Sequence, residues 1–256
     1  MRRVLDRIGS WLGRTLSRPR HVHGSAQPTP CAALLASLRP GDVLLAEGHA
    51  RISSAIKYLT QSTWSHAALF VGDALAARAP AGHCFIEADL VDGVRSVGVA
   101  EFDGLLTRIC RPSGLTDADC DRVVAFVVER IGLQYDLRNV FDLARYLFPT
   151  PPVPQRFRRR MIALGSGDPT RAICSTLIAQ AFQSVHYPVL PDVSRQSAGD
   201  PQCPGCMKEI LHVRHHSLFT PRDFDVSPYF EIVKPSLIGG FDYRSLHWDG
   251  EQGVVP

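Results

Sequence analysis

Two segments of the chain carry a cysteine and a histidine that could act together as a nucleophile and its base. Cys174 stands at the start of the apolar run ICSTLIAQAF, and His66 opens the run HAALFVG well upstream of it. A thiol attacks a carbonyl carbon as the thiolate, which near neutral pH needs a helix N-terminus, a neighbouring imidazolium or both. The pair therefore predicts acyl transfer through a thioester on the cysteine.

The residues around Cys174 predict a buried helix. Glycine and proline residues in GSGDPTRAIC precede it, and the apolar residues after it recur at helical spacing: Leu177, Ile178, Ala181, Phe182 and Val185. Cys174 would then lie in the first turn, where unpaired backbone N–H groups favour a thiolate and can hold an oxyanion. The alternative is a small core residue, because free cysteine is among the most buried residue types.

His66 opens a predicted strand, since the residues after it would alternate between two apolar faces. An imidazole on a buried strand needs a partner, and a carboxylate on its second ring nitrogen would fix the tautomer. Glu87 and Asp89 share one face of the next predicted strand, residues 83–90. Their spacing leaves open which of them is that partner. The alternative for His66 is a structural histidine.

The elements that would position these residues are short strands and helices in one domain. A basic segment, residues 1–30, precedes a domain over residues 31–256, with inserted loops near residues 149–168 and 197–216. The predicted strands cover residues 41–48, 64–73, 83–90 and 94–102, with helices over residues 51–62 and 117–131 and a turn leading to a last strand within residues 219–233.

Composition limits the classes of function. The formal net charge of +3 is not gathered into one basic face, so nucleic acid is not an expected partner. We expect a cytoplasmic protein, because we find neither a membrane-spanning apolar stretch nor a secretory signal. The seven cysteines are odd in number and scattered, which favours reduced thiols over a disulfide scaffold.

The first twenty residues predict a basic amphipathic helix. Apolar side chains stand near helical spacing, with arginines between them and one acidic residue, Asp6. Such a helix can lie on an anionic membrane surface, which would make the protein peripheral to the inner membrane. The alternative is a terminal helix that is frayed or docked on the core.

A second cluster of potential ligands follows residue 200. Cys203 and Cys206 directly flank a Pro-Gly pair, and His212 and His215 follow closely. Thiolate and imidazole ligands at such spacing can hold zinc tetrahedrally. A structural zinc, and with it a zinc-stabilised interaction module, is one interpretation; a redox-labile surface pair is another. We expect no other cofactor.

Six segments in a fixed order resemble the permuted papain-like hydrolases of the NlpC superfamily, the YaeF and YiiX kind. They are GDVLL, WSHAALFVGD, FIEA, GLQYD, ICSTLIAQAF and TPRDFDVSPYF. Papain-like enzymes have the cysteine helix before the histidine strand, whereas the permuted branch has histidine first, as here. Lecithin retinol acyltransferase-like enzymes are distant relatives. The resemblance implies an α+β fold in which a cysteine-bearing helix packs against a small, mostly antiparallel sheet.

The resemblance also implies roles for individual residues. Cys174 would be the nucleophile, His66 the general base and acid, and Glu87 the group that orients the imidazole. The residues expected to shape the site are Tyr135 and Asp136, which match the family's Tyr-Asp pair, and Ser65 and Ser175, which adjoin His66 and Cys174.

The expected reaction acts on an amide or ester. Bacterial relatives suggest peptide or peptidoglycan-type amides, and the acyltransferase relatives suggest lipid-like acyl substrates. A non-catalytic protein that keeps the fold and binds a membrane or ligand is the alternative. The presence of Cys174, His66 and Glu87 together favours the enzyme.

Overall fold

The computed structural model describes residues 28–134, except 77, 90 and 91, then residues 173–197 and 207–235, and the single residues Asp242 and Arg244. The basic segment of residues 1–20 and the Pro- and Arg-rich stretch near residues 149–168 therefore lie outside the described residues, and the predictions made for them stay predictions.

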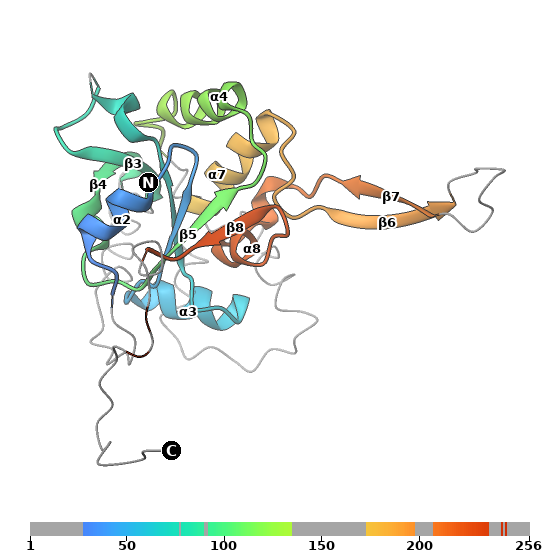
Figure 1. Cartoon of the computed structure of the whole chain (residues 1–256), viewed down its shortest axis with the longest axis horizontal. Helices are drawn as coiled ribbons and strands as arrows, with labels where there is room; N and C mark the ends of the chain where they lie inside the picture. The colour runs from blue at the N-terminus through green and yellow to red at the C-terminus, as the bar shows by residue number, and fades with distance from the viewer. Residues whose placement is uncertain are drawn as a thin grey trace, which may run out of the picture.

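A six-stranded antiparallel sheet forms the centre of the fold (Figure 1). Its strand order is β4-β3-β2-β1-β5-β8, and each neighbouring pair is antiparallel. The strands are β1 (Val43–Ala46), β2 (His66–Phe70), β3 (His83–Asp89), β4 (Gly93–Gly98), β5 (Thr107–Pro112) and β8 (Phe230–Val233).

Helices cover the sheet and close its ends. The described helices are α2 (Cys31–Ser37), α3 (Arg51–Thr60), α4 (Asp117–Val128), α7 (Ile173–Ser184) and α8 (Pro221–Asp225), with short 3-10 turns at Gly72–Leu75, Val99–Phe102 and His216–Leu218. Figure 1 shows α4 and α7 together on one side of the sheet. In the described part of the chain, no helix has the length and apolarity needed to cross a bilayer.

Two apolar clusters lie on opposite faces of the sheet. On one face, Leu177 and Phe182 of α7 pack against Ala67 and Leu69 of β2. The other face carries Ala68 and Phe70, which pack with residues of α2 and β3. This alternation follows from the two-residue period of a strand. It confirms the α+β fold in which the cysteine-bearing helix packs on a largely antiparallel sheet.

Several elements differ from the sequence-based expectations, among them the strand expected over residues 94–102, which ends at Gly98 and continues as the 3-10 turn Val99–Phe102. Residues 117–131 were expected to be helical, but α4 ends at Val128, one turn before Gly132, which has a φ of +87°. The expected turn after Phe219 contains the short helix α8, whose capping box joins Thr220 and Asp223. Strand β5 was not predicted at all, although it lies between β1 and β8.

A separate two-stranded sheet extends from the domain. Strands β6 (Asp192–Ser197) and β7 (Met207–His212) pair with each other in an antiparallel hairpin, which projects away from the rest of the fold (Figure 1). The stretch near residues 197–216, expected to be an inserted loop, therefore contains a strand.

Candidate active site

Cys174 is the second residue of α7, as its helical pattern predicted. Its neighbours Leu177 and Phe182 are buried in the cluster that fixes α7 against β2, so the helix has little freedom to move the thiol. The Cys174 side chain is 5% exposed, interacts with the imidazole of His66, and lies 3.9 Å from the Ser175 hydroxyl. The thiol is thus held at the start of a buried helix, beside an imidazole.

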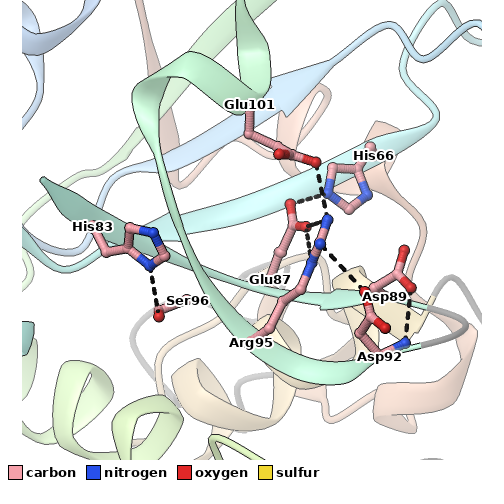
Figure 2. A network of polar contacts seen from close by, with 8 residues as sticks. All are labelled: His66, His83, Glu87, Asp89, Asp92, Arg95, Ser96 and Glu101. Atoms are coloured by element: carbon pink, nitrogen blue, oxygen red, sulfur yellow. Dashed lines mark hydrogen bonds and ion pairs between the residues drawn. The ribbon is translucent and has the colours of Figure 1, made fainter. Parts of the chain in front are cut away.

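His66 lies between the thiol and a carboxylate. As the first residue of β2, it stands at an end of the sheet, opposite Ala46 of β1. Its Nε2 lies 2.7 Å from Oε2 of Glu87 (Figure 2), which leaves Nδ1 as the ring nitrogen for Cys174. The carboxylate fixes both the tautomer and the plane of the ring.

The register of β2 and β3 explains why Glu87 is the partner. Ala68 pairs with Glu87, so Glu87 is a diagonal neighbour of His66 on the same face, and a long side chain can span that separation. The described pairing of the two strands ends there. Asp89 lies beyond it, and its Oδ1 accepts a hydrogen bond from the backbone N–H of Asp92. Of the two carboxylates left open by the sequence, the structure places Glu87 at the imidazole.

The three groups shift one another's pKa values toward the charged forms. Burial alone would raise the pKa of the Cys174 thiol, but the His66 imidazolium, a backbone hydrogen bond from Ala67 and the Ser175 hydroxyl lower it below its ordinary 9.0. Burial alone would lower the pKa of His66, but Cys174 and Glu87 raise it well above 6.5. The arrangement favours a thiolate–imidazolium pair at neutral pH.

Arg95 completes this charge network, and the sequence analysis missed it. It lies on β4 directly opposite Glu87, and its Nε donates to Oε1 of Glu87 at 2.9 Å. The same guanidinium reaches Asp92 at 3.3 Å and Glu101 at 2.9 Å, as Figure 2 shows. Burial would raise the pKa of Glu87, but His66 and Arg95 bring it below its ordinary 4.5. The Asp92-Gly93 turn was the available signal, because a hairpin there sets the strands' register.

Of the four residues expected to shape the site, two lie within the described structure. The buried Ser65 accepts a hydrogen bond from the Gly48 N–H at 2.9 Å, which ties the end of β1 to the residue before His66. A Cβ on Gly48 would stand 2.5 Å from the Ser53 hydroxyl, so this close approach needs glycine. Ser175 is buried beside the thiol. Tyr135 and Asp136 lie outside the described residues.

The expected zinc ligands are only partly within the described structure. Cys203 and Cys206 lie outside it. His212 pairs through Nε2 with the Ser194 hydroxyl at 2.7 Å, and the ring of His215 lies 4.1 Å from that of His216 at a tilt of 32°. Among the described residues, no group of three His, Cys, Asp or Glu side chains is placed to hold a metal ion. The zinc site therefore stays a prediction.

Comparison with protein families identifies a match over the N-terminal half of the fold. Residues 37–147 match the model of the family described as permuted papain-like amidase enzyme, YaeF/YiiX, C92 family. The matched segment contains His66, Glu87 and Arg95, and Cys174 lies beyond it. No curated protein matches the chain. The match confirms the family resemblance over GDVLL, WSHAALFVGD, FIEA and GLQYD, and the other two segments lie beyond it.

Proposed function

We propose, from the match of residues 37–147 to the permuted papain-like YaeF/YiiX family, that this chain is an amidase whose nucleophile is Cys174. Cysteine-dependent amide hydrolysis is the activity that the family indicates. The finer assignment to Cys174, His66 and Glu87 is ours. The observation that carries it is the contact of one imidazole with both a buried thiol and, at 2.7 Å, a buried carboxylate.

The reaction would proceed in two halves. The Cys174 thiolate attacks the amide carbonyl carbon, and the oxyanion forms near the backbone N–H groups at the start of α7. His66 gives its proton to the leaving nitrogen as the C–N bond breaks, leaving a thioester on Cys174. Water then attacks the thioester while His66 takes its proton, which releases the acid and restores the thiolate.

Glu87 would hold the imidazole through both halves. Its carboxylate stabilises the imidazolium and keeps Nδ1 aimed at the sulfur. Because Glu87 is only 2% exposed, its negative charge needs the compensation that His66 and Arg95 supply on its two oxygens.

Peptide-type amides are the substrates we propose to screen first, because the matched family is described as an amidase. Lipid esters form the second set of substrates to screen, because their cleavage would pass through the same thioester. Transfer of the acyl group to an acceptor other than water would also start from it.

The test is the pH dependence of alkylation by iodoacetamide, read at each cysteine by mass spectrometry. Cys31, Cys84, Cys110 and Cys120 serve as internal standards, because burial raises the pKa of each of these thiols. We expect Cys174 alone to react quickly well below the pKa of about 8.5 of a free thiol.

Two histidine variants separate mechanism from general destabilisation. His66→Ala should abolish the low-pH reactivity of Cys174. His83→Ala is the matched control, since His83 lies on β3 and contacts Ser96 at 2.9 Å (Figure 2); it should leave the reactivity intact. A Cys174 that reacts no faster than Cys110 in the native protein would favour the non-catalytic alternative.

A further inference from the structure

A polar pocket of about 660 Å³ lies at the end of the sheet where β1 ends and β2 begins. Its wall includes Glu47, which follows the residue paired with His66, and Trp64, which stands two residues before His66. The remaining lining comes from α3, the loop after it, β5 and α8: Lys57, Gln61, Ser62, Thr63, Arg108, Arg222 and Asp225. A molecule bound at Cys174 could therefore extend into it.

The lining of the pocket has more positively than negatively charged side chains. Lys57 pairs with Glu47 at 2.8 Å, and Arg108 pairs with Asp225 at 2.5 Å. The third cation, Arg222, donates from Nη1 to the backbone carbonyl of Thr60 at 3.0 Å. Within the part of the chain that the structure describes, no carboxylate lies at ion-pair distance from Arg222. The lining thus carries one more positive charge than negative charges.

The same contacts argue against a cationic ligand. Both oxygens of Asp225 are engaged, one by Arg108 and the other by the Trp64 indole N–H at 3.0 Å. The guanidinium of Arg108 also lies 5.0 Å from the centroid of the Trp64 ring, so a cation already occupies an aromatic face. Arginine carries five N–H donors in a fixed fork that matches a carboxylate, and most of those on Arg222 remain for a ligand.

We propose that this pocket is a subsite for a carboxylate of the substrate, which would be a peptide-like amide with a free carboxylate a few bonds from the scissile bond. This proposal rests on the proposed function, since it takes Cys174 as the reacting group. Arg222 is its central ligand, and Arg108 and Lys57 add to the positive potential.

The experiment compares two alkylating probes that differ in one charge. N-iodoacetyl-β-alanine carries the carboxylate, and its methylamide is the neutral match. We expect the acid to alkylate Cys174 about tenfold faster than the methylamide, the size of one charge-assisted hydrogen bond. In Arg222→Gln this ratio should fall toward one, whereas Arg222→Lys, which keeps the charge, should retain much of it.

Arg195→Gln is the control, because Arg195 lies on the β6–β7 hairpin, outside the pocket, and it should leave the ratio unchanged. Equal rates for the two probes in the native protein, or a ratio that Arg222→Gln does not lower, would overturn the subsite.

A second measurement keeps the subsite testable if the proposed function fails. If Cys174 reacts with neither probe, binding of N-acetyl-β-alanine and its methylamide is followed by NMR at millimolar concentration on the unmodified protein. Binding of the acid alone, lost in Arg222→Gln, supports the anion subsite without catalysis. Absence of acid binding overturns it.

Discussion

Replacing Arg95 by methionine should destabilise the protein by about 2 kcal/mol at neutral pH. The substitution removes the guanidinium that donates to Oε1 of Glu87 from Nε at 2.9 Å, while keeping much of the side chain's apolar length. A hydrogen bond to a charged group contributes about 1.5–3 kcal/mol. Arg95 is 33% exposed, so solvent screens part of this interaction, and we take about 2 kcal/mol as the net loss. For a chain of this size that corresponds to a fall in Tm of about 4–8 °C.

The pH dependence identifies the cause of the loss. The folded-state pKa of Glu87 lies below its ordinary 4.5, so its contribution to stability is present above pH 4.5 and disappears as the pH falls through the folded-state pKa. Removing Arg95 raises that folded-state pKa. The difference in unfolding free energy between native protein and Arg95→Met should therefore be largest near pH 7 and shrink as the pH falls below 4.5.

Urea unfolding across a pH series measures this difference. Arg122→Met is the matched control, because Arg122 is 67% exposed and forms only a surface pair with Asp119 on α4; it should cost less than about 0.5 kcal/mol. The reasoning is refuted if Arg95→Met costs no more than Arg122→Met, or if its cost is the same at pH 7 and at pH 4.

Three further substitutions test the helices and the thiol. Phe182→Ala should cost about 3–5 kcal/mol of unfolding free energy, because Phe182 is fully buried on α7 and its ring lies 5.3 Å from that of Phe230; a loss below 1 kcal/mol in urea unfolding would contradict this. Thr116→Ala should cost about 1 kcal/mol by the same measurement, because the Thr116 hydroxyl caps α4 by accepting from the Asp119 N–H; no change would show that the cap adds nothing. Ser175→Ala should move the onset of Cys174 alkylation to higher pH, because the Ser175 hydroxyl helps to lower the pKa of that thiol; an unchanged pH profile would exclude this contribution.

The placement of Cys174 and His66 could be predicted because each depends on a short local pattern. Apolar residues at helical spacing put Cys174 near the start of α7, and an alternating apolar run put His66 at the start of β2. The order of the motifs then indicated the fold, since histidine before cysteine is the mark of the permuted arrangement.

The identity of the carboxylate partner could not be predicted, because it depends on how two strands meet. Glu87 and Asp89 are equivalent by alternation along β3. The described β2–β3 pairing ends at Ala68 and Glu87. Asp89 instead accepts a hydrogen bond from the backbone N–H of Asp92 in the turn that follows. Arg95 escaped notice for the same reason, since its position opposite Glu87 exists only once β3 and β4 have paired.

Strand β5 was missed because its sequence, TRICRP, lacks a clear apolar alternation. Ile109 and Cys110 are buried, while the two arginines beside them have partners distant in sequence: Asp225 for Arg108 and Asp42 for Arg111. A charged residue is a poor strand signal until such partners are known. Strand β5 pairs with β1 on one side and β8 on the other, and these ion pairs offset the charge of its two arginines.

The projecting hairpin of β6 and β7 should exchange its backbone amide hydrogens at a different rate from the six-stranded sheet. A two-stranded ribbon is marginally stable alone, and Val193, Met207 and Leu211 remain exposed on this one. Its ladder can separate while the six-stranded sheet stays intact, so its backbone amides should exchange with deuterium by local fluctuation. The amides of β1 and β2, which are paired on both sides, should exchange only through far rarer openings.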